Sequence, residues 1–228
     1  DYIVGMQSCN MWKEGTHFGW DWINPFEERH SYMGFYDEGS PEVKDWEIKW
    51  MLEHGIDYEL FCWYRPPAGN NQPIKYPRNA YALHEGFMNT RYKDRINFAI
   101  AWENGSIGVS GSQDFRENVV PFWMEQYFKD PSYLVVDNKP VVSIYNFSRL
   151  KEGFGSVEGI RAEMDYLRQA CIDEGFDGCI ILMSSSTMSE TEMQEMSDAG
   201  IDCIYNYSWG QSAAVVETQM TNLEKQRD

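Results

Sequence analysis

The 228-residue sequence predicts an α/β protein, a (β/α)8 TIM barrel of which about six of the eight strand–helix units are present. Two observations lead to this prediction. Short apolar runs alternate with helical stretches six times, which indicates a parallel sheet with right-handed helical crossovers. A long loop follows the first strand, as in a barrel that builds its active site from such loops, whereas the Gly-rich turn of a nucleotide-binding sheet does not follow it.

The six predicted strands are runs of four to eight largely apolar residues that are bounded by turn residues. They lie at residues 2–6, 56–63, 96–102, 140–145, 178–183 and 201–205. Several of them are apolar almost throughout, as expected of strands that are covered on both faces.

Helix start and stop signals lie between these strands. Ser40 is an expected N-cap followed by Pro41, and the helix should end near Gly55, where glycine supplies a left-handed stop. Ser189 and Glu192 have the spacing of a capping box at the start of a later helix. The predicted helices span residues 40–54, 116–129, 157–174, 189–200 and 212–227.

Charge and composition exclude several classes of protein. The net charge is −17, with 19 basic against 36 acidic residues, which argues against nucleic acid or an anionic membrane surface as a partner. There is no apolar run long enough to span a membrane. Five cysteines without a CxxC pair argue against a disulfide framework and against a zinc site, and we expect no metal and no cofactor.

The ends of the predicted strands carry the side chains that a sugar would contact. Aromatic rings pack on the flat C–H faces of sugars, and amides and carboxylates hydrogen-bond sugar hydroxyls. The candidates are Trp12 after strand one, Trp63 and Tyr64 after strand two, Trp102, Glu103 and Asn104 after strand three, Tyr145 and Asn146 after strand four, and Tyr205 and Tyr207 after strand six. An ordinary alternative is that strand ends become polar wherever they leave a core, and that the aromatic residues, 15% of the chain, form a large core.

Glu103 is the best candidate for a catalytic carboxylate within this chain. It directly follows an apolar strand, where partial burial would raise its pKa and suit it to acid–base work or to holding a sugar hydroxyl. The alternative is an ordinary loop glutamate before Gly105. A convincing second carboxylate is not evident, because Glu38 lies in an expected turn and Asp57 and Asp202 lie at strand starts, the stability face of a barrel.

Four groups of segments resemble glycoside hydrolase family 99, the endo-α-mannosidases, and its WbsX-like relatives. They are MGFYDEGSPEV (33–43), CWYRPP (62–67), YFKDPSY (127–133) with DNKPVV (137–142), and DAGID (198–202) with YNY (205–207). These segments occur in consistent order over nearly the whole chain. The resemblance implies a (β/α)8 barrel that cleaves α-mannosides within a glycan and retains the anomeric configuration.

The resemblance also implies roles for individual residues. Glu103 matches a substrate-contacting glutamate, Tyr205 and Tyr207 match a tyrosine-bearing strand end near the reacting sugar, and Tyr36, Trp63 and Tyr64 match cleft-lining aromatics. The two catalytic glutamates of the family lie in an Asn-Glu-Trp-x-Glu-Gly segment that this sequence lacks. We therefore expect residues 1–228 to form a single barrel domain that is incomplete at its C-terminus, with the catalytic pair beyond residue 228.

The predicted function is therefore a retaining glycoside hydrolase that acts on an α-linked mannoside or a related oligosaccharide or polysaccharide. Family habit favours a secreted, periplasmic or cell-surface location. Two alternatives stay open: a non-catalytic carbohydrate-binding barrel, and a glycan-assembly enzyme of the WbsX type. The second alternative would require a nucleotide sugar.

Overall fold

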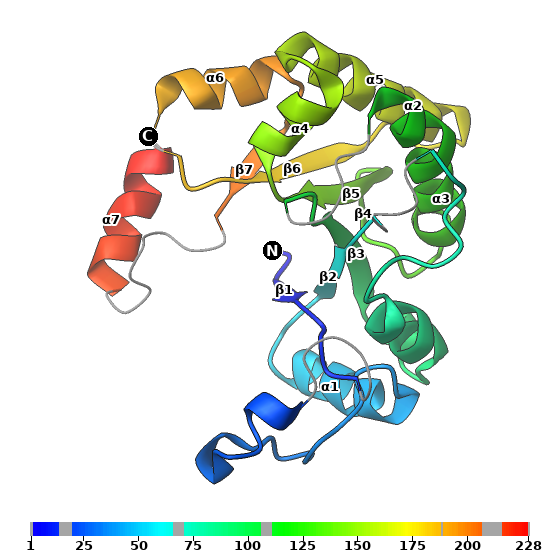
Figure 1. Ribbon diagram of the computed structural model, residues 1–228, viewed down its shortest axis with the longest axis vertical. Helices are drawn as coiled ribbons and strands as arrows, with labels where there is room; N and C mark the ends of the chain where they lie inside the picture. The colour runs from blue at the N-terminus through cyan, green and yellow to red at the C-terminus, as the bar shows by residue number, and fades with distance from the viewer. Residues whose placement is uncertain are drawn as a thin grey trace. The chain divides into compact units, whose positions relative to one another are not determined.

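The computed structural model describes residues 2–13, 20–65, 71–105, 111–187, 189–206 and 216–227. The chain divides into two compact units, each made from separate stretches of sequence. Residues 1–64, 75–101 and 125–134 form the first unit, and residues 65–74, 102–124 and 135–228 form the second. Figure 1 follows the elements of both units along the chain.

The first unit contains three neighbouring strands in chain order. They are β1 (Gly5–Ser8), β2 (Tyr58–Trp63) and β3 (Asn97–Trp102), whose last residue already belongs to the second unit. Strands β1 and β2 are parallel, with Gly5 opposite Tyr58. The connecting helices are Trp20–Trp22, Glu27–Arg29 and α1 (Pro41–Glu53) before β2, and Ala82–Gly86, Phe87–Asn89 and Lys93–Arg95 before β3.

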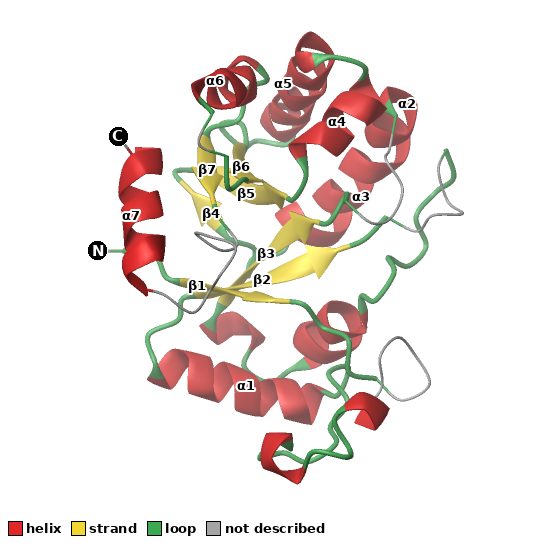
Figure 2. Ribbon diagram, turned by 60° about the vertical axis from the view of Figure 1, so that its left-hand side comes forward, coloured by secondary structure: helices red, strands yellow, loops and turns green. Residues whose placement is uncertain are grey.

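The second unit contains the parallel strands β5 (Lys139–Ile144), β6 (Ile180–Ser184) and β7 (Cys203–Tyr205), again in chain order. The short strand β4 (Val135–Val136) pairs antiparallel with β5. The helices that follow these strands are α4 (Phe147–Phe154) and α5 (Val157–Asp173) after β5, α6 (Glu190–Asp198) after β6 and α7 (Val216–Arg227) after β7. Figure 2 shows α4, α5 and α6 beside the three strands.

All six predicted strands are present, and five of them begin and end within about two residues of the expected positions. The first strand is the exception, because it begins at Gly5 and leaves Tyr2 and Ile3 exposed. Strand β4 was not predicted. It forms a hairpin with β5 through Asp137 and Asn138, which both have positive φ angles (49° and 57°), as a two-residue turn of this kind requires.

Two aspartates at strand starts have the stabilising role that their positions predicted. The carboxylate of Asp57 accepts a hydrogen bond from the amide of Val4 at 2.8 Å, and the amide of Asp57 donates to the Val4 carbonyl at 2.7 Å. Asp202 makes the same pair of bonds to Ile181, at 2.8 and 3.0 Å. Each aspartate therefore pins its own strand to the neighbouring strand at the N-terminal end.

The cap and stop signals of the first long helix act as predicted. The Ser40 hydroxyl accepts from the amide of Val43, and α1 ends before Gly55, which has a φ of +72°. The helix expected at 116–129 instead begins at Ser112 and passes through α2 (Ser112–Asp114), the π-helical turn Phe115–Val119, α3 (Val120–Trp123) and a second π-helical turn, Met124–Phe128. Pro121 lies inside this stretch and has no amide hydrogen, so regular α-helical bonding cannot run through it.

A buried ion pair joins α1 to β2 in the first unit. The ammonium group of Lys44 lies 3.0 Å from the Glu59 carboxylate, with both side chains at most 1% exposed. Burial opposes the charged form of Lys44, but Glu59 and Glu47 outweigh it and raise the pKa of Lys44 above its usual value. The Ser8 hydroxyl donates to Glu59 at 2.7 Å, so β1 takes part in the same network.

In the described parts of the chain, no helix is long and apolar enough to cross a lipid bilayer.

Candidate functional site

A polar pocket of about 360 Å³ lies at the C-terminal ends of the parallel strands of the second unit. It is lined by Tyr145, Asn146, Phe147 and Ser148 after β5, by Ser184, Ser185 and Ser186 at the end of β6, by Glu192 and Met196 of α6, and by Asn206 after β7. In α/β proteins with parallel strands, this end of the sheet is where ligands bind. The pocket is therefore the candidate site.

Asn104 and Asn146 hold the ends of two strands together. The Asn104 side chain donates to the Asn146 carbonyl at 2.9 Å and accepts from the Asn146 amide at 2.8 Å. The Asn146 side chain in turn accepts from the amide of Arg149 at 3.0 Å and so caps the start of α4. Asn104 is only 1% exposed, so it positions Asn146 at the pocket from below the surface.

Glu103 and Tyr145 both lie close to Gly105. The Glu103 carboxylate accepts from the Gly105 amide at 3.1 Å. A methyl group placed on Gly105 would lie 2.7 Å from this carboxylate and 3.2 Å from the Tyr145 ring, so both groups crowd the same glycine. Tyr145 lines the pocket, whereas Glu103 is not among the lining residues and lies behind the same glycine as the Tyr145 ring.

Tyr205 fixes the wall formed by β6 and β7. Its hydroxyl accepts a hydrogen bond from Ser143 at 2.6 Å, and its carbonyl accepts from the amide of Ser185 at 2.9 Å. The Ser185 hydroxyl accepts from the amide of Thr187 at 3.1 Å. These bonds set the path of the serine run that lines the pocket.

Trp102 lies beneath the site rather than at its surface. Its side chain is 1% exposed and stacks on Phe115 with ring centroids 5.7 Å apart, while Trp123 meets its edge at 5.5 Å. The ring therefore supports the strand end from the core.

In the first unit, Trp12 and Tyr36 meet through a third aromatic residue. The rings of Trp12 and Trp20 are stacked with centroids 4.4 Å apart, and the Trp20 indole donates to the Tyr36 carbonyl at 2.8 Å. Burial, with smaller effects of Glu47 and Glu38, raises the pKa of Tyr36 to about 12, so its hydroxyl stays protonated near neutral pH.

Trp63 and Tyr64 are buried in the first unit, with 2% and 7% of their surface exposed. The Trp63 indole donates to the Tyr127 hydroxyl at 3.1 Å, and the same hydroxyl lies 2.8 Å from His84 Nε2. The pKa of His84 is lowered by burial, so a neutral ring can accept a hydrogen bond from the Tyr127 hydroxyl. These rings therefore pack within a core network.

The structure thus brings together Glu103, Asn104, Tyr145, Asn146 and Tyr205 at one end of the second unit, with Trp102 below them. The remaining candidates, Trp12, Tyr36, Trp63 and Tyr64, belong to the first unit. Tyr207 lies outside the described residues.

Two carboxylates near these elements were not identified from the sequence as site residues. The segment around Glu38 forms the expected turn, in which the Asp37 carboxylate accepts from the Gly39 amide at 2.7 Å. The Glu38 side chain nevertheless turns inward, is 6% exposed and accepts from the Trp12 amide at 2.8 Å. Glu192, expected to close a capping box, lines the pocket instead. Neither direction is encoded in residue type or spacing.

Among the residues that the structure describes, no group of three or more His, Cys, Asp or Glu side chains is placed to hold a metal ion.

A family model described as Glycosyltransferase WbsX matches residues 28–228. The chain belongs to this family. The resemblance drawn from the sequence is thereby confirmed. No match is found among curated proteins.

Two solved structures of the GH99 endo-α-mannosidase from Bacteroides thetaiotaomicron share the fold. One, in complex with bis-tris-propane, is 14% identical, has a TM-score of 0.56 and is matched over 86% of this chain and 57% of its own. The other is 15% identical, has a TM-score of 0.60 and is matched over 87% and 52%. The WbsX family chain therefore has the fold of a partial (β/α)8 barrel, as predicted, and spans a little over half the length of these structures.

Proposed function

We propose that this chain supplies part of the cleft of a glycoside hydrolase that acts on an α-linked mannoside or a related neutral glycan. The observation that carries the proposal is the composition of the pocket. Two aromatic rings, four serine hydroxyls, two carboxamides, one carboxylate and one methionine line it, and none of its ten lining residues is Lys or Arg. This set of groups matches a sugar ring, which presents both C–H faces and hydroxyls.

Glu103 is proposed to hold a sugar hydroxyl next to the Tyr145 ring. Its carboxylate accepts a backbone hydrogen bond from Gly105, which fixes its direction. The distant GH99 neighbours support the hydrolase proposal at the level of the fold.

Glycan assembly is the second candidate, and the family description favours it. A transferase that uses a nucleotide sugar needs groups that stabilise a diphosphate, such as Lys, Arg or a metal ion. The pocket residues supply no positive side chain, which weighs toward a neutral ligand. A non-catalytic carbohydrate-binding barrel would use the same pocket without cleavage.

The test is incubation of the natural full-length protein with α-linked mannans, followed by mass spectrometry of the products. We expect shortened oligosaccharides without added nucleotide, and at least a tenfold lower rate for Glu103→Gln. Binding without any product would favour the non-catalytic alternative, and elongation that depends on GDP-mannose would overturn the hydrolase proposal. An absence of both binding and product would overturn the carbohydrate proposal as a whole.

A further inference from the structure

The capping arrangement at the start of α6 leaves the carboxylate of Glu192 to line the pocket. In a complete capping box, this carboxylate would accept a hydrogen bond from the amide of Ser189. The structure forms only one half of the box, in which the Ser189 hydroxyl accepts from the Glu192 amide at 3.4 Å. The Ser189 amide donates to the Thr187 hydroxyl at 3.1 Å instead.

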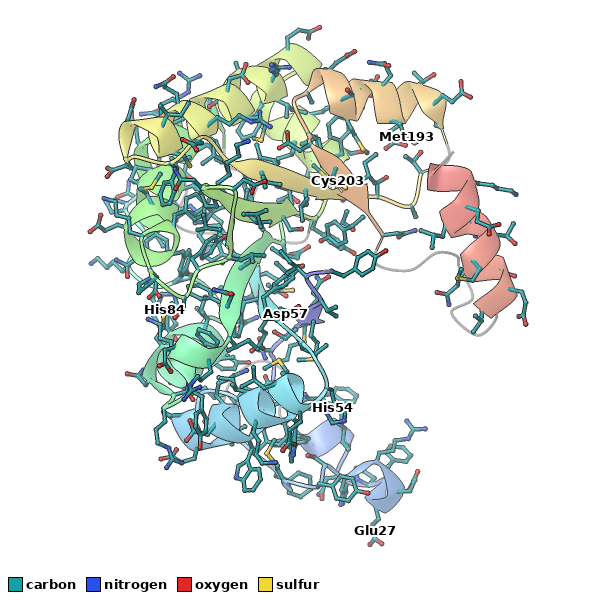
Figure 3. The ribbon with its side chains drawn as sticks, turned by 180° about the vertical axis from the view of Figure 1, so that it is seen from behind. Glu27, His54, Asp57, His84, Met193 and Cys203 are labelled. Atoms are coloured by element: carbon teal, nitrogen blue, oxygen red, sulfur yellow. The ribbon has the colours of Figure 1, made fainter. Side chains whose placement is uncertain are left out.

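No other side chain in the described part of the chain pairs with Glu192. Lys151 forms an ion pair with Glu195 of α6 at 2.9 Å, one turn further along the helix than Glu192. Glu192 is the one carboxylate among the ten pocket-lining residues, and it is partly exposed. In Figure 3, Met193 marks the part of α6 that carries Glu192, and Cys203 marks β7.

The chemistry of the neighbouring groups narrows the ligand that a free carboxylate selects. Serine hydroxyls and carboxamides both donate and accept, so they accommodate many polar ligands, whereas a carboxylate only accepts and repels anions. Its two oxygens can accept from two hydroxyls on adjacent carbons, and hydrogen bonds to a charged acceptor are stronger than neutral ones. Tyr145, which is 38% exposed, offers a ring to the C–H face of the same sugar.

We propose that Glu192 is the specificity residue of this pocket: it anchors one neutral sugar residue through two adjacent hydroxyls and disfavours phosphorylated and nucleotide-linked sugars. The inference rests on the proposed function, since it assigns a substrate class to the same site. It goes beyond it by naming a second carboxylate, on α6, that is separate from Glu103.

The test compares Glu192→Gln with the matched control Glu190→Gln, which removes the same charge from the same helix turn at a residue that does not line the pocket. The probe is an α-linked mannotriose, and its dissociation constant for the full chain is measured by calorimetry. We expect Glu192→Gln to weaken binding at least tenfold and Glu190→Gln to weaken it less than twofold. Circular dichroism confirms that both variants are folded.

A second arm uses mannotriose analogues that each lack one hydroxyl. For the two analogues that lack a hydroxyl bound by Glu192, the affinity ratio between wild type and Glu192→Gln should be smaller than for mannotriose, because one of the two contacts is already gone. GDP-mannose should bind wild type at least tenfold more weakly than mannotriose and should gain affinity in Glu192→Gln. A wild-type preference for GDP-mannose would overturn the inference.

The experiments distinguish an error in the role of Glu192 from an error in the proposed function. Equal mannotriose affinity in wild type and Glu192→Gln would overturn the role of Glu192 and leave the proposed function standing. A wild-type chain that binds no neutral oligosaccharide would overturn the proposed function together with this inference.

Discussion

Glu38, which is hydrogen-bonded to Trp12, has a carboxyl group that should titrate near neutral pH. Glu38 accepts from the Trp12 amide at 2.8 Å, and its own amide donates to the Trp12 carbonyl at 3.0 Å. Burial raises the pKa of the Glu38 carboxyl from 4.5 to about 7, and Glu47 adds to this effect, while Trp12, Asn10 and Lys44 act in the opposite direction. The substitution Glu38→Gln keeps an acceptor for the Trp12 amide and removes the titrating group.

The magnitude follows from the difference between the two pKa values. Between pH 4.5 and about 7 the folded chain keeps a proton on Glu38 that the unfolded chain has released. The folded state is therefore disfavoured as pH rises through this window, by about 1.4 kcal/mol per pH unit and about 3 kcal/mol in total. Above pH 7 both states are ionised and this dependence ends. Glu38→Gln should match wild type near pH 4.5 and exceed its free energy of unfolding by up to about 3 kcal/mol at pH 8.

The assay is urea denaturation of both proteins by tryptophan fluorescence at four pH values between 5 and 8. The quantity of interest is the difference between the two proteins at each pH, because it cancels the other titrating groups they share. An isotope-labelled carboxyl titration by NMR measures the Glu38 pKa directly. A Glu38 midpoint below pH 5, or a stability difference that does not change with pH, would refute the reasoning.

Two further predictions concern buried polar contacts of the second unit. Asp114→Asn should lower the free energy of unfolding by about 3–5 kcal/mol. The reason is that Asp114 accepts hydrogen bonds from the Arg65 guanidinium at 2.7 and 2.9 Å, with both side chains 1% exposed. A loss below about 1 kcal/mol in urea denaturation would contradict this. Asn104→Ala should cost about 2–3 kcal/mol in the same assay, because it leaves the Asn146 amide and carbonyl without their partner, and unchanged hydrogen exchange at the Asn146 amide would contradict it.

The sequence predicted the features that depend on neighbouring residues. The Ser40 cap, the stop at Gly55 and the six apolar strands depend on signals that lie within a few residues of one another, and all are present. The predicted start of β1 was wrong because Asp57, 53 residues away from Val4, fixes it. Asp57 is hydrogen-bonded to both the amide and the carbonyl of Val4. Apolar character marked the strand, but its pairing partner decided where it begins.

The candidate site was predicted less completely, because its side chains depend on tertiary packing. Glu103, Tyr145 and Asn146 were found by their positions at strand ends, which the parallel topology places at one edge. Glu38 and Glu192 were assigned to a turn and a cap, and both local structures are largely present. The side chain of each residue nevertheless turns elsewhere, toward Trp12 in one case and toward the pocket in the other.

The aromatic residues show why composition alone could not locate the site. Trp63, Trp102 and Trp123 are each at most 2% exposed and form the core, while Tyr145 is 38% exposed and lines the pocket. The aromatic residues therefore contribute both to a large core and to the pocket wall, the two explanations that the sequence left open. Carboxylates discriminate better, because a carboxylate inside a protein must be paired, protonated or directed at a ligand. Lys44 pairs with Glu59, burial raises the pKa of Glu38 to about 7, and Glu192 lines the pocket. Of the three, the last is the one that points to a function.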